Sequence, residues 1–176
     1  MIRIELTMHE LMEAATCGVL RRITSIRDRR DKNLHARVSD WTTDIDGACA
    51  EKAVAKWRGV YWDGGVGTFK AADLPGLHVR STPHRGGHLI VRPNDDYSPD
   101  ALFVLVITAA PLFLLAGWQH CSYAKREQFW RAGRNGEAAA WWVPQAMLFP
   151  MEELDGYAAQ HDQGRARGPD PAGKAA

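Results

Sequence analysis

The run ALFVLVITAAPLFLLAGW, residues 101–118, holds 18 residues without a charged side chain. Its length alone is enough for a short membrane span. However, the first arm, residues 102–108, is rich in Phe, Val and Ile, and an Ala-Ala-Pro sequence at 109–111 separates it from a second apolar arm at 112–117. Because proline disrupts a helix interior, this pattern favours two buried strands joined by a short turn over a membrane helix. We therefore expect a globular protein with no membrane partner.

Two helical patterns precede this run. Apolar residues recur at helical spacing over residues 8–26, where Thr7 can cap the first turn, and over residues 43–58. The second helix is expected to bury a stripe through Cys49 and Ala53, and Glu51 lies off that stripe.

The remaining expected elements complete a single fold. Strands are expected at residues 77–82, 89–92 and 141–143, and further helices at residues 122–131 and 151–161. This order predicts an α/β (α+β) fold with a mixed central β-sheet flanked by helices. We expect a single globular domain over residues 1–161, followed by a flexible C-terminal tail over residues 162–176 that is rich in Gly, Pro and Ala.

Charge is distributed unevenly along the chain. The formal net charge is +1, yet residues 21–37 hold seven Lys or Arg against two Asp, which is +5 for that segment. Such asymmetry indicates a polyanionic partner, with a solvated helix end and loop as the alternative. The candidate nucleic-acid contacts are Arg21, Arg22, Arg27, Arg29 and Arg30, together with Arg85 and Arg92 farther along the chain.

The cysteines and the amino terminus bear on the compartment. Cys17, Cys49 and Cys121 are widely spaced and odd in number, which is atypical of a disulfide framework and favours a reducing compartment. Residues 1–15 carry acidic side chains and lack the apolar run of a secretory signal. We expect a cytoplasmic protein, and a homo-oligomer remains possible.

Four segments carry a resemblance to a known family. They are GACAEKAVAKWRGVYW at 47–62, AADLPGLHVRST at 71–82, HLIVRPNDD at 88–96, and the apolar strand that ends in AGW at 116–118. Over these roughly 70 residues the chain resembles the PD-(D/E)XK (restriction-endonuclease-like) nuclease superfamily, in particular its small phage and bacterial members. In that family a helical glutamate, an aspartate and a Glu-x-Lys pair converge on a divalent metal.

The resemblance implies four site residues, two of which depart from the family pattern. Glu51 matches the helical glutamate, Asp73 the aspartate, and His78 and Arg80 take the places of the Glu and Lys. This implies a Mg²⁺ or Mn²⁺ ion bound by Glu51, Asp73 and His78, although imidazole shifts the preference away from Mg²⁺. Arg80 stays protonated, so it cannot act as a base and instead binds phosphate.

Each of these residues has a simpler alternative. Glu51 can be an exposed helix residue paired with a neighbouring Lys or Arg, and Asp73 a turn residue before a Pro-Gly sequence. The adjacent aspartates at 95 and 96 can add metal oxygens, but a loop cap is favoured. His78, His84 and His88 invite a zinc interpretation, against which the Pro and Gly between them favour a turn.

Three functions follow from these observations. The leading expectation is a nucleic-acid-processing protein, a metal-dependent phosphodiesterase (DNase) whose activity is weakened or altered by the two departures. The alternative is a non-catalytic nucleic-acid-binding or assembly protein on the same fold. The third is an interaction module unrelated to nucleic acid. The sequence at 141–145, WWVPQ, can offer an aromatic stacking platform for bases or fill the core.

Overall fold

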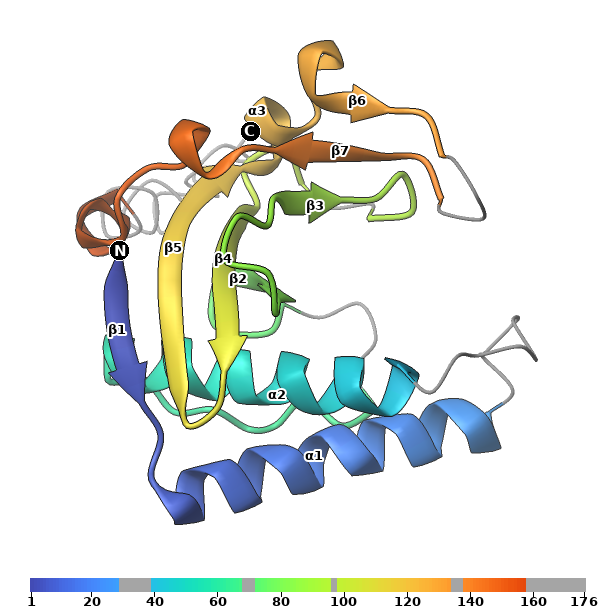
Figure 1. Ribbon diagram of the computed structural model, residues 1–176, viewed down its shortest axis with the longest axis vertical. Coiled ribbons are helices and arrows are strands. Elements are labelled where there is room, and N and C mark those ends of the chain that lie inside the picture. The colour runs from blue at the N-terminus through green and yellow to red at the C-terminus, as the bar shows by residue number, and fades with distance from the viewer. Residues whose placement is uncertain (29–38, 68–71, 96–97, 134–137, 158–176) are drawn as a thin grey trace, which may run out of the picture.

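The computed structural model describes residues 1–28, 39–67, 72–95, 98–133 and 138–157. Two long helices cover one side of a four-stranded sheet, and a three-stranded sheet lies at the opposite side of the molecule (Figure 1). The fold is therefore mixed α+β with a mixed sheet flanked by helices, as the sequence predicts. The second sheet is an addition that the sequence did not indicate.

The four-stranded sheet, sheet A, has the strand order β1-β5-β4-β2. Strand β4 (Leu102–Ala109) pairs antiparallel with β5 (Leu112–His120) and parallel with β2 (Leu77–Thr82). The charge-free run at 101–118 thus forms the predicted pair of strands. No helix among the described residues is long and apolar enough to cross a membrane. Strand β1 (Ile2–Glu5), which pairs with β5, was missed because its four residues carry too little pattern.

Both predicted amino-terminal helices are present. Helix α1 (Met8–Arg27) begins at a capping box, in which Thr7 Oγ1 accepts from the Glu10 amide and Glu10 Oε2 accepts from the Thr7 amide. Helix α2 (Ser39–Arg58) begins earlier than predicted. It packs between α1 and sheet A (Figure 1). Its buried residues lie between Ala48 and Ala55 and include positions beside the expected stripe.

Strand β4 separates two hydrophobic cores. Leu102, Val104 and Val106 point to the core under α2, whereas Phe103 and Leu105 point to a second core. The first seven residues of β4 are all buried, as expected for a central strand covered on both faces. The same alternation on the edge strand β2 places Leu77 and Val79 under α2 and sends the intervening side chains to the other side.

The second sheet, sheet B, closes the second core. Its order is β3 (Leu89–Val91), β7 (Ala140–Val143), β6 (Trp130–Arg131), and all pairs are antiparallel. The helix predicted over residues 122–131 is wrong. That stretch forms a four-residue helix α3 (Cys121–Ala124), a 3₁₀ turn (Glu127–Phe129) and β6. Its local pattern is overridden because Phe129 and Cys121 are buried in the second core beside β7.

The carboxy-terminal elements are short. Two 3₁₀ turns, Gln145–Met147 and Met151–Glu153, follow β7. The helix predicted over residues 151–161 begins as the second of these turns, and helical residues follow it to 157. Residues 158–161 and the predicted tail lie outside the described part of the chain.

Candidate functional site

Asp73 lies in a tight turn that leads into the edge strand β2. Leu74 and Leu77 close this turn through two backbone hydrogen bonds, and Asp73 Oδ2 accepts the Val79 amide at 2.7 Å. This contact satisfies an exposed edge N–H of β2 and fixes the carboxylate beside the strand. Burial raises the pKa of Asp73, and the Val79 amide and the charges of Arg80 and Arg21 oppose that shift.

Glu51 is buried on α2, with an exposed fraction of 4%. The alternative that it is an exposed residue paired with a neighbour is therefore wrong. Arg21 of α1 forms a bidentate ion pair with its carboxylate, in which Nη1 donates to Oε1 at 2.6 Å and Nη2 donates to Oε2 at 2.6 Å. The indole N–H of Trp62 donates to Oε2 at 3.0 Å, and Arg21 also donates to the Gly64 carbonyl.

The charge state of this pair follows from its contacts. Burial raises the pKa of Glu51, Arg21 lowers it, and the negative charge of Asp73 raises it further. Burial works to lower the pKa of Arg21, but its hydrogen bonds to Glu51 and the negative charges of Glu51 and Asp73 together raise it. Glu51 and Asp73 are thus close enough to repel each other, and the Arg21 guanidinium is attracted by both.

His78 and Arg80 project from the opposite face of β2, where both contact Phe103. The imidazole of His78 lies 5.3 Å from the Phe103 ring, and the Arg80 guanidinium lies over that ring at 5.1 Å. Burial, and next the charge of Arg80, lower the pKa of His78 to about 4, so this imidazole is neutral at neutral pH. His78 Nδ1 is 3.9 Å from Asp73 Oδ2, a contact that is not an ion pair while the ring is neutral.

Asp95 is the acidic partner of Arg80. Its Oδ2 accepts from Arg80 Nη2 at 3.0 Å and from the Arg92 amide at 2.9 Å. The second contact confirms the predicted loop cap, and the first adds an ion pair that the sequence did not indicate. Residue 96, the other aspartate of the predicted pair, lies outside the described residues.

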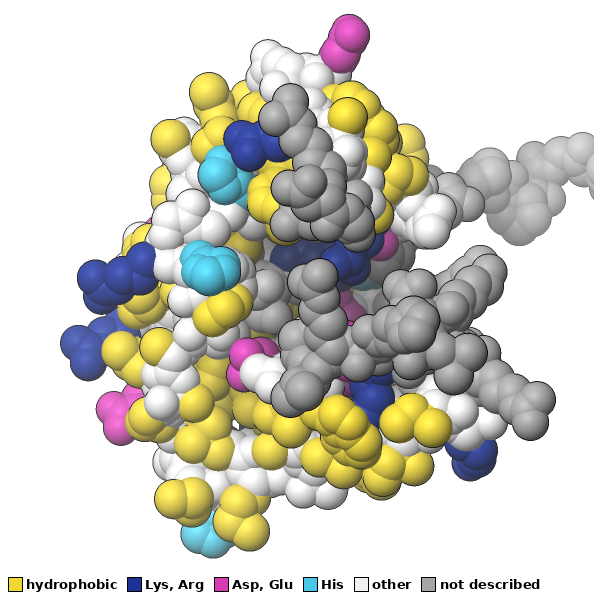
Figure 2. Space-filling view, turned by 45° about the vertical axis from the view of Figure 1, so that its right-hand side comes forward, with side chains coloured by type: hydrophobic (Ala, Val, Ile, Leu, Met, Phe, Trp, Pro, Cys, Tyr) yellow, Lys and Arg dark blue, Asp and Glu magenta, His cyan; other side chains and the backbone are white. Residues whose placement is uncertain are grey.

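Asp73 is consequently the centre of the site. Glu51 lies toward the α2 side of β2, His78 and Arg80 lie on the other side, and Asp73 interacts with both groups across the strand edge. Figure 2 shows acidic and basic side chains gathered in a recess between the helices and the sheet B part of the molecule.

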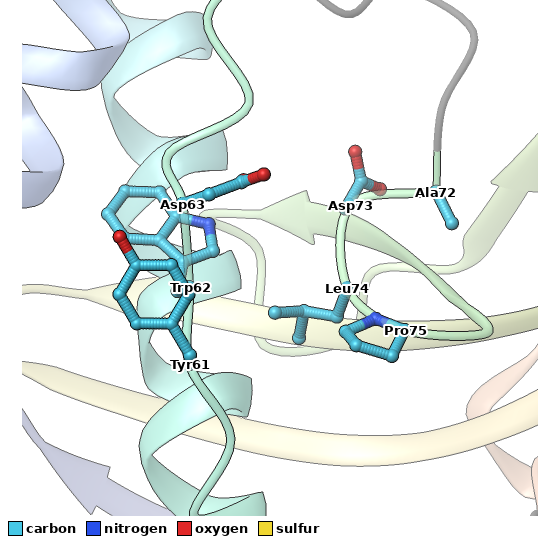
Figure 3. A pocket seen from close by; sticks show the side chains of 7 residues that line it. All are labelled: Tyr61, Trp62, Asp63, Ala72, Asp73, Leu74 and Pro75. Carbon is cyan, nitrogen blue, oxygen red and sulfur yellow. The ribbon is translucent and has the colours of Figure 1, made fainter.

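A pocket of about 410 Å³ opens beside this centre. One wall comes from residues 61–63, which follow α2, and the other from residues 72–75, which precede β2. The Asp63 side chain points toward the opposite wall, whereas the Asp73 carboxylate points upward along its own wall (Figure 3). Trp62, which lines the pocket, also donates to Glu51, so the pocket adjoins both predicted carboxylates.

The donor types suit a divalent cation, but one of them is engaged. Carboxylate oxygens and a neutral imidazole are ordinary ligands of Mg²⁺ or Mn²⁺. Both oxygens of Glu51 accept from Arg21, so a cation can use Glu51 only after Arg21 releases at least one of them. Within the described ranges, no group of three or more His, Cys, Asp or Glu side chains is close enough together to hold a metal ion.

The basic residues assigned to nucleic acid have diverse environments. Arg22 is buried between α1 and α2, where its Nε donates to Asp44 at 2.6 Å. Arg27 is 75% exposed in its side chain and pairs with the adjacent Asp28. Arg85 and Arg92 are exposed on loops around β3. The predicted contacts at 29 and 30 lie outside the described residues.

The other two histidines of the zinc interpretation lie apart from Asp73. His84 is exposed on the turn after β2, and His88 makes an edge contact with Trp142. Their placement agrees with the predicted turn rather than with a zinc site.

Sequence reasoning missed the roles of Arg21 and Asp95. Arg21 was counted with the basic segment, yet it is the partner of Glu51, 30 residues away. Its position on the helix could have indicated a buried partner, because Arg21 lies one turn after Cys17, on the side of α1 that faces residue 64. Comparison with protein-family models, curated proteins and solved structures found no match for this chain.

Proposed function

We propose that this protein is a divalent-metal-dependent nucleic-acid phosphodiesterase of the PD-(D/E)XK type. The observation that supports the proposal is the placement of Asp73, partly buried beside the edge strand β2, between Glu51 on one side and His78 with Arg80 on the other. The proposal includes a restriction-endonuclease-like fold, with α2, β2, β4 and β5 as its helix-and-sheet core.

Each side chain has a role in this proposal. Glu51, Asp73 and His78 would hold a Mg²⁺ or Mn²⁺ ion once Arg21 releases Glu51 and the three side chains come closer together than they are in the structure, and the ion would supply a Lewis acid for the phosphate and acidify bound water. Hydrolysis adds a water oxygen to phosphorus and breaks one bond from phosphorus to a sugar oxygen. A neutral imidazole has a single free nitrogen lone pair, so His78 would serve either as the third ligand or as the hydrogen-bond acceptor that orients the water. Arg80 remains positive and stabilises charge on the phosphate.

A second function is supported by the same contacts. Arg21 neutralises Glu51, and Arg80 is bound to Asp95 rather than directed at an open site. A scaffold of this kind can bind phosphates through its arginines without cutting them. The second candidate is therefore a non-catalytic nucleic-acid-binding or assembly protein on the same fold.

Metal-dependent cleavage distinguishes the two candidates. Purified protein is incubated with single- and double-stranded DNA and with Mn²⁺ or Mg²⁺, and metal binding is followed by calorimetry. The variants Glu51→Gln and Asp73→Asn should each abolish cleavage and weaken metal binding. The matched controls Glu13→Gln and Asp155→Asn remove exposed carboxylates of the same types and should change neither. Equal cleavage by both site variants and the parent contradicts the proposed assignment.

A restoring double variant tests the two departures from the family pattern. His78→Glu with Arg80→Lys supplies an oxygen ligand and an amine whose pKa a buried site can lower. An inactive parent should gain Mg²⁺-dependent cleavage, whereas a parent that prefers Mn²⁺ should shift its preference toward Mg²⁺. No cleavage and no metal binding by either protein supports the non-catalytic candidate instead.

A further inference from the structure

Strand β6 of sheet B carries an exposed tryptophan that contacts a second tryptophan on β7 with the ring planes inclined at 59°. Trp130 of β6 is 41% exposed, and its ring centroid lies 4.6 Å from that of Trp141 on β7. Trp141 also packs against the second core, which holds it in place. Core packing therefore explains Trp141, but it leaves the exposed ring of Trp130 without a role.

Cations accompany the aromatic rings of this region. Lys125 Nζ lies 5.7 Å from the Trp141 ring centre, and two arginines lie over neighbouring rings, Arg126 on Tyr123 at 4.2 Å and Arg131 on Trp142 at 5.5 Å. Trp141 and Trp142 are adjacent on β7 and face opposite sides of sheet B, so Lys125 lies on the side of Trp141 and Arg131 on the other side. Figure 2 shows mainly hydrophobic side chains on this upper part of the molecule.

A short series of contacts links these rings to the candidate site. Lys125 Nζ donates to the backbone carbonyl of Asp95 at 2.6 Å, and the Asp95 carboxylate binds Arg80 at 3.0 Å. Arg80 lies on the strand that Asp73 precedes. Arg80 and Lys125 thus share Asp95 as a partner, and a chain bound by Arg80 through a phosphate would have Lys125 nearby.

We propose that Trp130 and Trp141, with Lys125, form a stacking site for an unpaired nucleobase, so that the protein binds single-stranded nucleic acid. This inference rests on the proposed function, whose substrate it narrows. Stacking of a base on an aromatic side chain needs a free base face, which a duplex interior does not present, whereas the nearby cations suit the phosphates on either side of that base.

Binding without metal tests the inference separately from cleavage. Fluorescence anisotropy at low ionic strength compares a labelled dT oligonucleotide with a labelled duplex hairpin. Trp130→Leu keeps an apolar side chain but removes the aromatic face, and it should lower affinity for the oligonucleotide by roughly 5- to 150-fold, the contribution of one stacked base. Its affinity for the duplex should be unchanged.

Matched variants separate stacking from folding. Trp41→Leu removes an equally exposed tryptophan, at 42%, from α2 and should change neither affinity. Trp130→Phe keeps a ring and should retain most of the oligonucleotide affinity. If Trp130→Leu does not fold, Lys125→Gln serves in its place and should lower the salt dependence of oligonucleotide binding by about one counterion.

Distinct outcomes reject the inference and the proposed function. A wild-type protein that does not bind the oligonucleotide overturns the stacking site, as does an equal loss of oligonucleotide and duplex affinity in Trp130→Leu. Selective loss in that variant, together with no metal-dependent cleavage by the wild type, retains the stacking site and rejects the nuclease.

Discussion

Replacing Arg21 by methionine tests the buried ion pair that organises the candidate site. The change keeps an unbranched apolar stem but removes both hydrogen bonds to Glu51 and those to the Gly64 carbonyl. Glu51 is then an unpaired charge whose side chain is only 6% exposed. Removing one partner of a buried ion pair destabilises proteins by about 3–5 kcal/mol. Because the Arg21 side chain is itself 19% exposed, we expect the lower end of that range.

Thermal and chemical unfolding measure this loss. A decrease of about 3 kcal/mol lowers the midpoint of a protein of this size by roughly 6–12 °C. Arg27→Met is the matched control on the same helix, since its side chain is 75% exposed, and it should change stability by less than about 0.5 kcal/mol. The double variant Arg21→Met with Glu51→Leu replaces the pair by apolar groups and should recover most of the loss.

The stability loss in Arg21→Met should depend on pH, and the raised pKa of Glu51 determines the direction of that dependence. A carboxyl group whose pKa is raised by folding favours the folded state at low pH, and that contribution is lost as the pH rises through the folded pKa. Losing Arg21 removes an interaction that lowers the pKa of Glu51. The difference between variant and wild type should therefore widen as the pH rises above the ordinary glutamate value. A loss below about 1 kcal/mol, or one that is constant with pH, refutes the argument that the pair is needed to bury Glu51.

Two further predictions concern the helix contact and His78. A Cβ at Gly18 would lie 2.6 Å from the Ile45 Cα, so Gly18→Ala should lower the unfolding free energy by about 1–3 kcal/mol in urea denaturation. Gly47 has open space around it, so Gly47→Ala should raise the unfolding free energy by up to about 1 kcal/mol. The pKa of His78 is about 4, so the unfolded chain binds an extra proton below the ordinary histidine value and stability falls from about pH 6.5 to 4. His78→Gln should flatten that slope, and an NMR titration that places the His78 pKa near 6.5 contradicts it.

Local signals were enough to predict the two long helices and the central strands, whereas long-range contacts decided other elements and the ion pairs. The proline at 111 and the apolar arms beside it identified β4 and β5, and Thr7 with Glu10 identified the start of α1. Strand β6 was predicted as helix because its pairing partners, Trp141 and Ala140, are 11 and 9 residues away along the chain. The pairs Arg21–Glu51 and Arg80–Asp95 join residues 30 and 15 positions apart, which neither periodicity nor turn chemistry specifies.

The Arg21–Glu51 pair also sets a condition on the proposed chemistry. The buried carboxylate of Glu51 and the partly buried one of Asp73 repel each other, so a positive charge beside Glu51 favours the folded chain. Arg21 supplies that charge in the structure, and a divalent cation would supply it in the proposed nuclease. Since both cations use the same oxygens of Glu51, their contributions cannot simply add. Metal binding and the contribution of Arg21 to stability must therefore be coupled, and a saturating metal should stabilise Arg21→Met more than it stabilises the wild type.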